Sequence, residues 1–480
     1  MAYYVVLTLA TATIAALAVA VWRKTRQIAF LLGFAFLYYW SLYGGWLVVN
    51  RGLGADRRYR FEYMFYRLFP IYLDQDYLWT LVLYSAFVVI VQLVVLGVAK
   101  PATTLRIPDR PIYISHAKLL AICAVMLAAA YLIVWPFVIA AASFGQSAYG
   151  ALGRGADPPL LSFYQLFHEL TAVVLLLGAS VLVSGRQSRF VASGSSGHWL
   201  GYAVVGVALL GLTLAMGRRS MLAFAGVGAV LFYLVNAAKP NRILVVGGLT
   251  AAGLSLVLLG ILRGSAAQRE FSDESIAGKV RYMIDETLTQ DVEAFAGHAS
   301  MYGVLQKHVP LTYGASFAWL ALSMVPSIVR PNVVPTGYEH YASHVGASMD
   351  QGFTLNHATG WYLNFGIPGL VLGAILLGTI WAMLFNGFLG AYRSRSYAAR
   401  VFYAVTFWTF TGYLPILIRS GVEAYKGAIT ESILVPALVM FIASLQLSRV
   451  ASRLRVVPLS APGALQPGAL ARSNLTKWPA

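Results

Sequence analysis

Apolar segments of close to twenty residues recur along this 480-residue chain, and shorter polar connections separate most of them. An α-helix of about 20 apolar residues spans the hydrocarbon core of a bilayer. The segments that meet this criterion are residues 3–21, 28–49, 78–98, 118–142, 163–184, 199–216, 221–238, 243–262, 357–388, 400–418 and 430–447. The sequence therefore predicts an all-α polytopic membrane protein with about eleven transmembrane helices.

The first apolar segment, Ala2 to Val21, has the length of a signal peptide but not its charge pattern. Its basic residues, Arg23, Lys24 and Arg26, follow the apolar run instead of preceding it. Positive charge accumulates on the cytoplasmic side of membrane helices, so the pattern predicts an uncleaved first helix with its amino terminus outside. The composition agrees with a membrane protein, since 59% of the residues are hydrophobic, 11% are charged and the mean hydropathy is +0.69.

The formal net charge of +17 comes from one side of the predicted topology. Nineteen of the 35 Lys and Arg residues lie on that side with a single acid, Asp109, whereas the other side carries 16 basic and 17 acidic residues. The basic side is assigned to the cytoplasm, which places the carboxyl terminus inside. Its charge suits anionic membrane lipids, so the excess does not indicate a nucleic-acid partner.

The predicted helices divide the chain into four regions. They are residues 1–262 with helices one to eight, 263–356 as a large, partly helical outer loop, 357–447 with helices nine to eleven, and 448–480 as a cytoplasmic tail. The loop is far longer than ordinary connections and is expected to fold, whereas the Pro/Gly/Ala-rich tail is expected to be disordered. The apolar run from Tyr313 to Val329 is expected to be re-entrant or surface-lying, because a twelfth span would turn Arg393, Arg395 and Arg400 outward.

Four arginines mark the outer side of the predicted topology. Arg218 and Arg219 form the tight turn between two apolar helices, while Arg263 and Arg269 open the large loop. Arginines at these places run against the positive-inside trend. A guanidinium matches phosphate oxygens in a bidentate fork, so the four predict a pocket for a lipid-borne phosphate. Snorkelling to headgroups and ion pairing of the loop arginines with nearby loop acids are the alternatives.

The helix after the loop begins with His357, at the predicted boundary between water and membrane. An imidazole can act as a general base near neutral pH, and Glu339 in the same loop is the alternative base. A structural histidine that caps the helix is equally consistent with the sequence. Glu339, His340 and His344 match no known zinc pattern, because a zinc site needs a third ligand besides two that lie one helical turn apart, so neither a metal nor a cofactor is expected. The single cysteine, Cys123, excludes an internal disulfide.

Two further patterns bear on the class of protein. Residues 74–76, Asp-Gln-Asp, have the DxD form of metal-using glycosyltransferases, but such matches are common by chance, and acids at a helix start interact favourably with the helix dipole. Glu169 and Glu431 lie near the outer ends of their helices, and charges in the middle of helices are almost absent. Ion-coupled transporters usually carry ionisable groups at the midplane, so a transporter or lipid-glycan flippase is the less favoured alternative.

Three segments follow one another around the large loop. They are Met216–Leu222 with arginines at an outer turn, Arg263–Arg269 at the start of the loop, and Trp361–Gly369 after it. In these segments the chain resembles the O-antigen polymerases and oligosaccharide repeat-unit polymerases (Wzy-type), which are related to the O-antigen ligases. The third segment is similar to the aromatic-Asn-Phe-Gly-x-x-Gly signature of that family. Where the ligases carry a histidine this chain has Leu355, two residues before His357, which favours a polymerase over a ligase.

The resemblance implies a metal-independent glycosyltransferase of the bacterial inner membrane, with a periplasmic active face. Such an enzyme polymerises repeat units linked to a polyprenyl diphosphate, for O-antigen, capsule or exopolysaccharide, and a chain-length regulator protein is a candidate partner. The four outer arginines would then bind the diphosphate leaving group, and His357 or Glu339 would take the proton of the acceptor hydroxyl.

Overall fold

The computed structural model describes most of the chain. The described residues are 1–52, 58–59, 71–102, 112–143, 158–184, 190–193, 197–216, 220–237, 240–248, 250, 292–323, 336–346, 354–391 and 394–454. Almost all of the regular structure among them is helical, and the four strands are two to four residues long. The prediction of an all-α architecture is confirmed.

Eight described helical segments are long and apolar enough to cross a membrane. They are α1 (Ala2–Thr25), the run of α2 (Ile28–Tyr38), the π-helix η1 (Tyr39–Tyr43) and α3 (Gly44–Gly52), α4 (Gln75–Val98), α5 (His116–Ser143), α7 (Pro158–Ser184), α16 (His357–Ala391), α17 (Tyr397–Arg419), and the run of α18 (Tyr425–Gly427), the π-helix η4 (Ala428–Leu434) and α19 (Val435–Leu454). The shorter apolar helices α8 (His198–Met216) and α9 (Ser220–Asn236) lie beside them.

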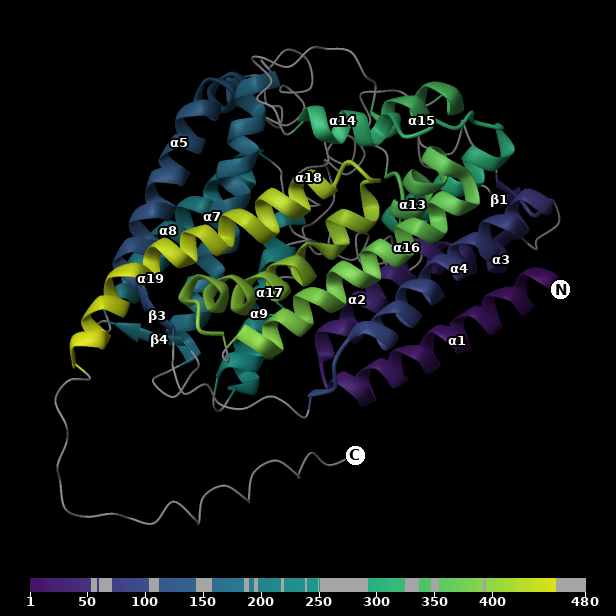
Figure 1. Cartoon of the computed structure of the whole chain (residues 1–480). Coiled ribbons are helices and arrows are strands. Elements are labelled where there is room, and N and C mark those ends of the chain that lie inside the picture. The colour runs from purple at the N-terminus through teal and green to yellow at the C-terminus, as the bar shows by residue number, and fades with distance from the viewer. Residues whose placement is uncertain are drawn as a thin grey trace.

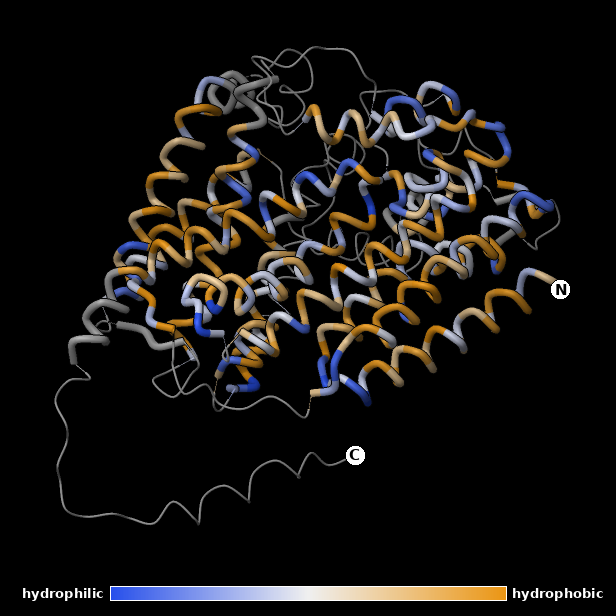
Figure 2. Tube along the Cα trace, viewed as in Figure 1, coloured by the Kyte–Doolittle hydropathy of each residue, from blue (hydrophilic) through white to orange (hydrophobic). Residues whose placement is uncertain are grey.

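These helices coincide with ten of the eleven predicted segments, and most of the remaining one, residues 243–262, lies outside the described residues. The protein is therefore a polytopic membrane protein, as its apolar pattern predicts. Figure 2 shows hydrophobic residues along the long helices and hydrophilic residues concentrated toward their ends. This is the distribution that a bilayer requires, because hydrocarbon cannot solvate polar side chains.

The long helices pack as neighbours through aromatic side chains and glycines. α16 lies between α4 and α17, α7 contacts α5 and α9, and α1 packs against α4 (Figure 1). The rings of Phe30 and Trp381 are 4.7 Å apart, and Phe407 lies 5.7 Å from Phe30. A Cβ on Gly412 would lie 2.8 Å from a backbone oxygen of α9, so glycine is required where α9 and α17 cross. Close packing of this kind holds membrane helices together, because lipid is as apolar as leucine.

The short helices and strands of the connections lie at the two ends of the helical body. One end carries the amino terminus, the strands β1 (Arg58–Tyr59) and β2 (Ile71–Tyr72), and the loop helices α13 (Val292–Gln306), α14 (Ala315–Ser323) and α15 (Gly337–Val345). The opposite end carries the parallel pair β3 (Ile112–Ser115) and β4 (Phe190–Ser193). We call the end with α13–α15 the loop end. The candidate catalytic residues lie there.

α14 forms most of the described part of the apolar run at residues 313–329. With nine residues it extends about 14 Å, half of the hydrocarbon thickness. It lies across the ends of the long helices in Figure 1 and not alongside them. This geometry suits a surface-lying helix. The division of the chain into membrane regions and loop stays a prediction.

The Asp-Gln-Asp sequence at residues 74–76 has a structural function. The carboxylate of Asp74 accepts a hydrogen bond from the backbone N–H of Tyr77 at 2.9 Å and so caps the first turn of α4. Its second oxygen accepts a hydrogen bond from the hydroxyl of Tyr302 on α13, also at 2.9 Å. Capping and attachment of the loop account for this acid without a metal.

Candidate functional site

α16 is interrupted within the Trp361–Gly369 segment. Phe365 and Gly366 have non-helical backbone angles, and Gly366 has a φ of 65° and a ψ of −145°, a conformation open only to glycine. The interruption separates a short leading half, residues 357–364, from the long membrane-crossing half. The carbonyl of Leu363 is freed by the break and accepts a hydrogen bond from the backbone N–H of Thr312 at 2.8 Å. The loop therefore caps the leading half.

His357 is the first residue of the leading half and is fully buried. Its Nδ1 lies 2.7 Å from the carbonyl oxygen of Gly421, which can only accept, so Nδ1 carries the proton. Nε2 consequently accepts, and its donors are the hydroxyl of Tyr425 and the indole N–H of Trp361, both at 3.1 Å. Both ring nitrogens thus have partners.

Two glycines let the leading half of α16 touch the turn between α17 and α18. A Cβ on Gly360 would lie 3.0 Å from the Cα of Gly421 and from the nitrogen of Val422. Gly421 has a φ of 66°, which favours glycine, and its N–H donates to the carbonyl of Leu355 at 2.7 Å. The close approach of two backbones fixes the carbonyl that holds His357.

Glu423 lies in the same turn, and nothing in the sequence singled it out. Its carboxylate accepts hydrogen bonds from the backbone N–H of Gly337, at the start of α15, and from the hydroxyl of Ser316 on α14. Burial raises the pKa of Glu423 above its ordinary value, and the charge of Glu339 adds to the effect. The only sequence signal was an acid in a short outer connection, two residues after a glycine.

Glu339, the alternative base, takes part in a capping box. Its backbone N–H donates to the hydroxyl of Thr336 at 2.9 Å, and its carboxylate accepts from the backbone N–H of Thr336 at 2.7 Å. This reciprocal pair satisfies two N–H groups at the beginning of α15. The charge of Glu339 contributes to the raised pKa of Glu423, and His357 donates a hydrogen bond to Gly421. The structure therefore brings both predicted bases to the α17–α18 turn. Their catalytic roles stay predictions.

A buried polar network attaches α13 to the membrane helices. The π-helical turn η1 leaves backbone carbonyls without the usual helical partner. The carbonyl of Trp40 accepts from the side-chain amide of Asn356 at 2.9 Å, and that of Ser41 accepts from Nδ1 of His298 at 2.7 Å. Nε2 of His298 in turn accepts from the hydroxyl of Tyr77 at 3.0 Å. Burial lowers the pKa of His298 to about 4, against the opposing effect of the Ser41 carbonyl, so the ring is neutral at pH 7.

Three hydroxyl groups extend this network to α16. Thr359 Oγ1 lies 2.9 Å from the hydroxyls of both Tyr84 on α4 and Ser300 on α13. The Tyr84 hydroxyl donates to the carbonyl of Gly297 at 2.7 Å. Because each group is buried, an unpartnered hydroxyl here would carry a desolvation cost of about 1–3 kcal/mol. The network therefore fixes the loop helix α13 against the start of α16.

The four predicted phosphate-binding arginines, Arg218, Arg219, Arg263 and Arg269, lie outside the described residues. The described helices on either side of the Arg218–Arg219 turn, α8 and α9, line an apolar cavity of about 510 Å³ together with α7 and the segment 240–248. The lining residues are Leu175, Leu176, Ala179, Ser180, Val183, Gly206, Leu209, Leu210, Leu222, Gly226, Ala229, Val230, Tyr233, Leu244 and Gly248. Such a cavity within a membrane protein suits a hydrocarbon chain.

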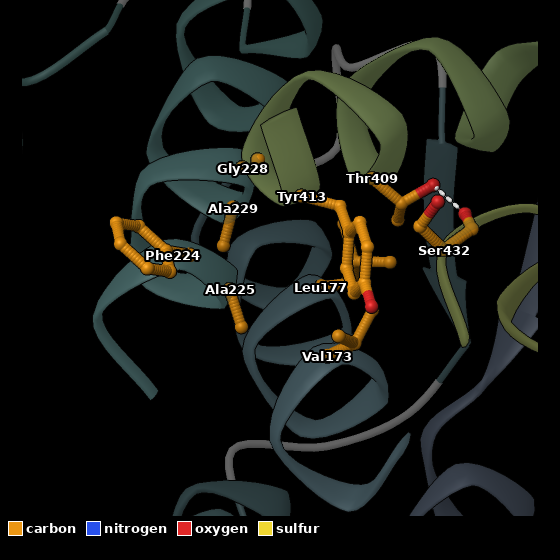
Figure 3. A pocket seen from close by; sticks show the side chains of 10 residues that line it. Val173, Leu177, Phe224, Ala225, Gly228, Ala229, Thr409, Tyr413 and Ser432 are labelled. Atoms are coloured by element: carbon orange, nitrogen blue, oxygen red, sulfur yellow. Dashed lines mark hydrogen bonds between the residues drawn. The ribbon is translucent and has the colours of Figure 1, made fainter. Parts of the chain in front are cut away.

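A second cavity lies between α7, α9, α17 and η4, and Figure 3 shows its lining. Its volume of about 10 Å³ is that of one water molecule at most. Tyr413 lies beside it, and the hydroxyl of Thr409 donates to the carbonyl oxygen of Ser432 in the π-helix η4. Like the carbonyls of Trp40 and Ser41 in η1, this carbonyl accepts a hydrogen bond from a side chain of another element. The cavity is too small for a substrate.

Among the described ranges, no group of three or more His, Cys, Asp or Glu side chains is placed to hold a metal ion. In comparisons with known proteins, no family model, no curated protein and no solved structure matches this chain.

Proposed function

We propose that this protein is a membrane glycosyltransferase that polymerises oligosaccharide repeat units linked to a polyprenyl diphosphate. The observation that carries the proposal is the meeting of three parts at the loop end. These are the interrupted start of α16, the α17–α18 turn and the folded helices of the large loop. The segment that resembles the polymerase signature forms the interruption, and His357 is buried one turn before Trp361.

The lipid-linked donor would be held by charge at its head and by apolar contact along its tail. Diphosphate departs as the glycosidic bond forms, and arginines at a dry boundary stabilise that charge without a metal. Arg218 and Arg219 connect α8 to α9, whose side chains line the apolar cavity of about 510 Å³. Two of the helices that line this cavity are thus joined by the arginine turn, which supports a donor with an anionic head and a polyprenyl chain.

The acceptor hydroxyl would lose its proton through Tyr425 and His357. As the acceptor oxygen bonds to the anomeric carbon, the bond from that carbon to the diphosphate breaks. The acceptor proton passes to the Tyr425 oxygen, while the proton of Tyr425 passes to Nε2 of His357 across 3.1 Å. The Gly421 carbonyl holds Nδ1–H and would stabilise the resulting imidazolium. His357 thereby keeps its predicted role as the base, with Tyr425 in contact with the substrate.

The proposal includes a location and a topology. The protein would lie in the bacterial inner membrane with eleven spans, its amino terminus outside and its carboxyl terminus in the cytoplasm. The strong basic bias of the loops opposite the loop end supports this orientation. The loop end would face the periplasm, where the acceptor is another lipid-linked repeat unit. The polymer would be O-antigen, capsule or exopolysaccharide.

A lipid-glycan flippase is the rival that one observation favours. Interrupted membrane helices are frequent at transporter binding sites, and α16 is interrupted at Phe365 and Gly366. In α16, however, the freed carbonyl is capped by the loop residue Thr312 instead of opening toward a transport path. A ligase shares the proposed chemistry and differs only in its acceptor.

The lipid-linked glycans of cells that lack this chain distinguish the three functions. A polymerase predicts accumulation of single repeat units on the outer leaflet. Accumulation of long, undelivered polymer would identify a ligase, and retention of repeat units on the cytoplasmic leaflet would identify a flippase. Either of the latter results would overturn the proposal.

A further inference from the structure

α15 presents two histidines at the loop end, outside the arrangement around His357. The helix begins with the capping box of Thr336 and ends at Gly346, which has a φ of 72°. His340 and His344 are one helical turn apart, and their ring centroids are separated by 4.4 Å. His340 is half-buried and His344 is exposed, so ions in the solvent can reach the pair.

Hydrogen bonds set the tautomers of both rings. Nε2 of His340 lies 2.8 Å from the carbonyl oxygen of Pro310, and Nδ1 of His344 lies 2.8 Å from the carbonyl oxygen of His340. A carbonyl only accepts, so these nitrogens carry the protons of the neutral rings. The hydroxyl of Ser343 is also 3.3 Å from Nδ1 of His344, but it donates to the same carbonyl oxygen of His340. Among the described residues, no hydrogen bond occupies the lone pair of His340 Nδ1 or of His344 Nε2.

We propose that His340 and His344 bind a divalent transition-metal ion of the Zn²⁺, Ni²⁺ or Cu²⁺ class. Imidazole nitrogen suits these ions, and two histidines separated by one helical turn are a recurrent ligand pair. A histidine that binds a metal almost always donates its other N–H to a carbonyl or carboxylate, and both histidines here do so. Water molecules complete the coordination, since the described residues supply no third protein ligand.

The expected consequence of binding is a more stable α15. The ion joins residues on successive turns and so opposes unwinding of the helix from its carboxyl end. The other end of α15 is tied to Glu423 through the N–H of Gly337. Metal binding therefore strengthens the attachment of α15 to the α17–α18 turn. The inference goes beyond the proposed function and does not depend on it.

Calorimetric titration of the purified, chelator-treated full-length protein with ZnCl₂ tests the site. Wild type is expected to bind one equivalent, and His340→Ala and His344→Ala are each expected to bind at least tenfold more weakly. The control is His308→Asn, which removes an exposed histidine of the same loop; asparagine tolerates the φ of 47° at that position. Thermal unfolding without metal verifies that each variant is folded.

Cu²⁺ provides a second, spectroscopic measurement of the site that does not rely on the heat of binding. The electron paramagnetic resonance spectrum is expected to show coupling to two imidazole nitrogens in wild type and to one in either single variant. Wild-type binding equal to that of the His340→Ala/His344→Ala double variant, or an equal loss in His308→Asn, would overturn the proposal.

Discussion

Replacement of Tyr425 by phenylalanine tests the relay between the acceptor and His357. The change removes one hydroxyl and leaves the ring that packs 5.0 Å from the imidazole. Nε2 of His357 keeps the indole N–H of Trp361 as a donor at 3.1 Å, so no buried acceptor is orphaned. The loss in stability is therefore that of one neutral hydrogen bond, about 1 kcal/mol.

The expected effect on catalysis is much larger than the effect on folding. General acid–base catalysis typically contributes a factor of about 10²–10⁴ in rate, so Tyr425→Phe is expected to lower the polymerisation rate at least a hundredfold. The matched control is Tyr131→Phe. Its hydroxyl donates to the carbonyl of Ala208 at 2.6 Å, between α5 and α8, and its loss removes one hydrogen bond away from the site.

The assay compares polymer formation by the purified variants in liposomes supplied with a lipid-linked repeat unit. Membrane abundance and the thermal unfolding midpoint are measured on the same preparations. Both variants are expected to fold like wild type, and only Tyr425→Phe is expected to lose activity. Full activity in Tyr425→Phe would refute the relay. Equal losses in the two variants would mean that the defect reports stability alone.

Four further predictions follow from other parts of the chain. Cysteines at positions 275 and 396 (Ser275→Cys and Ser396→Cys) are expected to label from opposite sides of the membrane, and labelling of both from one side would contradict the topology. Arg218→Ala is expected to reduce polymerisation roughly a hundredfold at normal abundance, with poor rescue by lysine, and unchanged polymer yield would argue against the diphosphate role. Gly366→Ala is expected to lower stability by about 1–3 kcal/mol in thermal unfolding, since its backbone conformation disfavours any side chain. Glu423 has a raised pKa, so its carboxylate binds a proton more tightly in the folded protein than in the unfolded chain. The contribution of Glu423 to stability therefore falls as the pH rises from the ordinary pKa of a glutamate to the raised pKa of Glu423. Glu423→Gln is expected to remove that dependence and to keep stability at pH 7, which unfolding midpoints measured across this pH range would check.

Several elements of the candidate site could be recognised in the sequence, but their contacts could not. His357 and the Trp361–Gly369 segment were identified by position and by resemblance, whereas the interruption at Phe365 and Gly366 appears only in the backbone angles. A Gly-x-Pro sequence permits such a break without requiring it. Tyr425 lies 68 residues from His357, and no local pattern connects two residues at that separation.

Glu423 shows a second limit of the sequence. An acid in a short outer connection looks like an ordinary solvated residue. Its raised pKa results from burial beneath α14 and α15, which begin more than eighty residues earlier in the chain. Glu339 is the opposite case. The Thr-x-x-Glu spacing of a capping box is present in the sequence, and the capping box accounts for the position of the Glu339 side chain.

The sequence by itself determined that this protein is an all-α membrane protein and where its apolar helices lie. That information is local, because each helix must satisfy its own backbone within about 20 apolar residues. Only the tertiary structure decided which helices are neighbours and where their regular backbone hydrogen bonding is interrupted. The carbonyls freed at η1 and at the break in α16 are bound by His298, Asn356 and Thr312, all from outside those helices. Such hydrogen bonds join segments that are far apart in the chain, so no local sequence pattern predicts them.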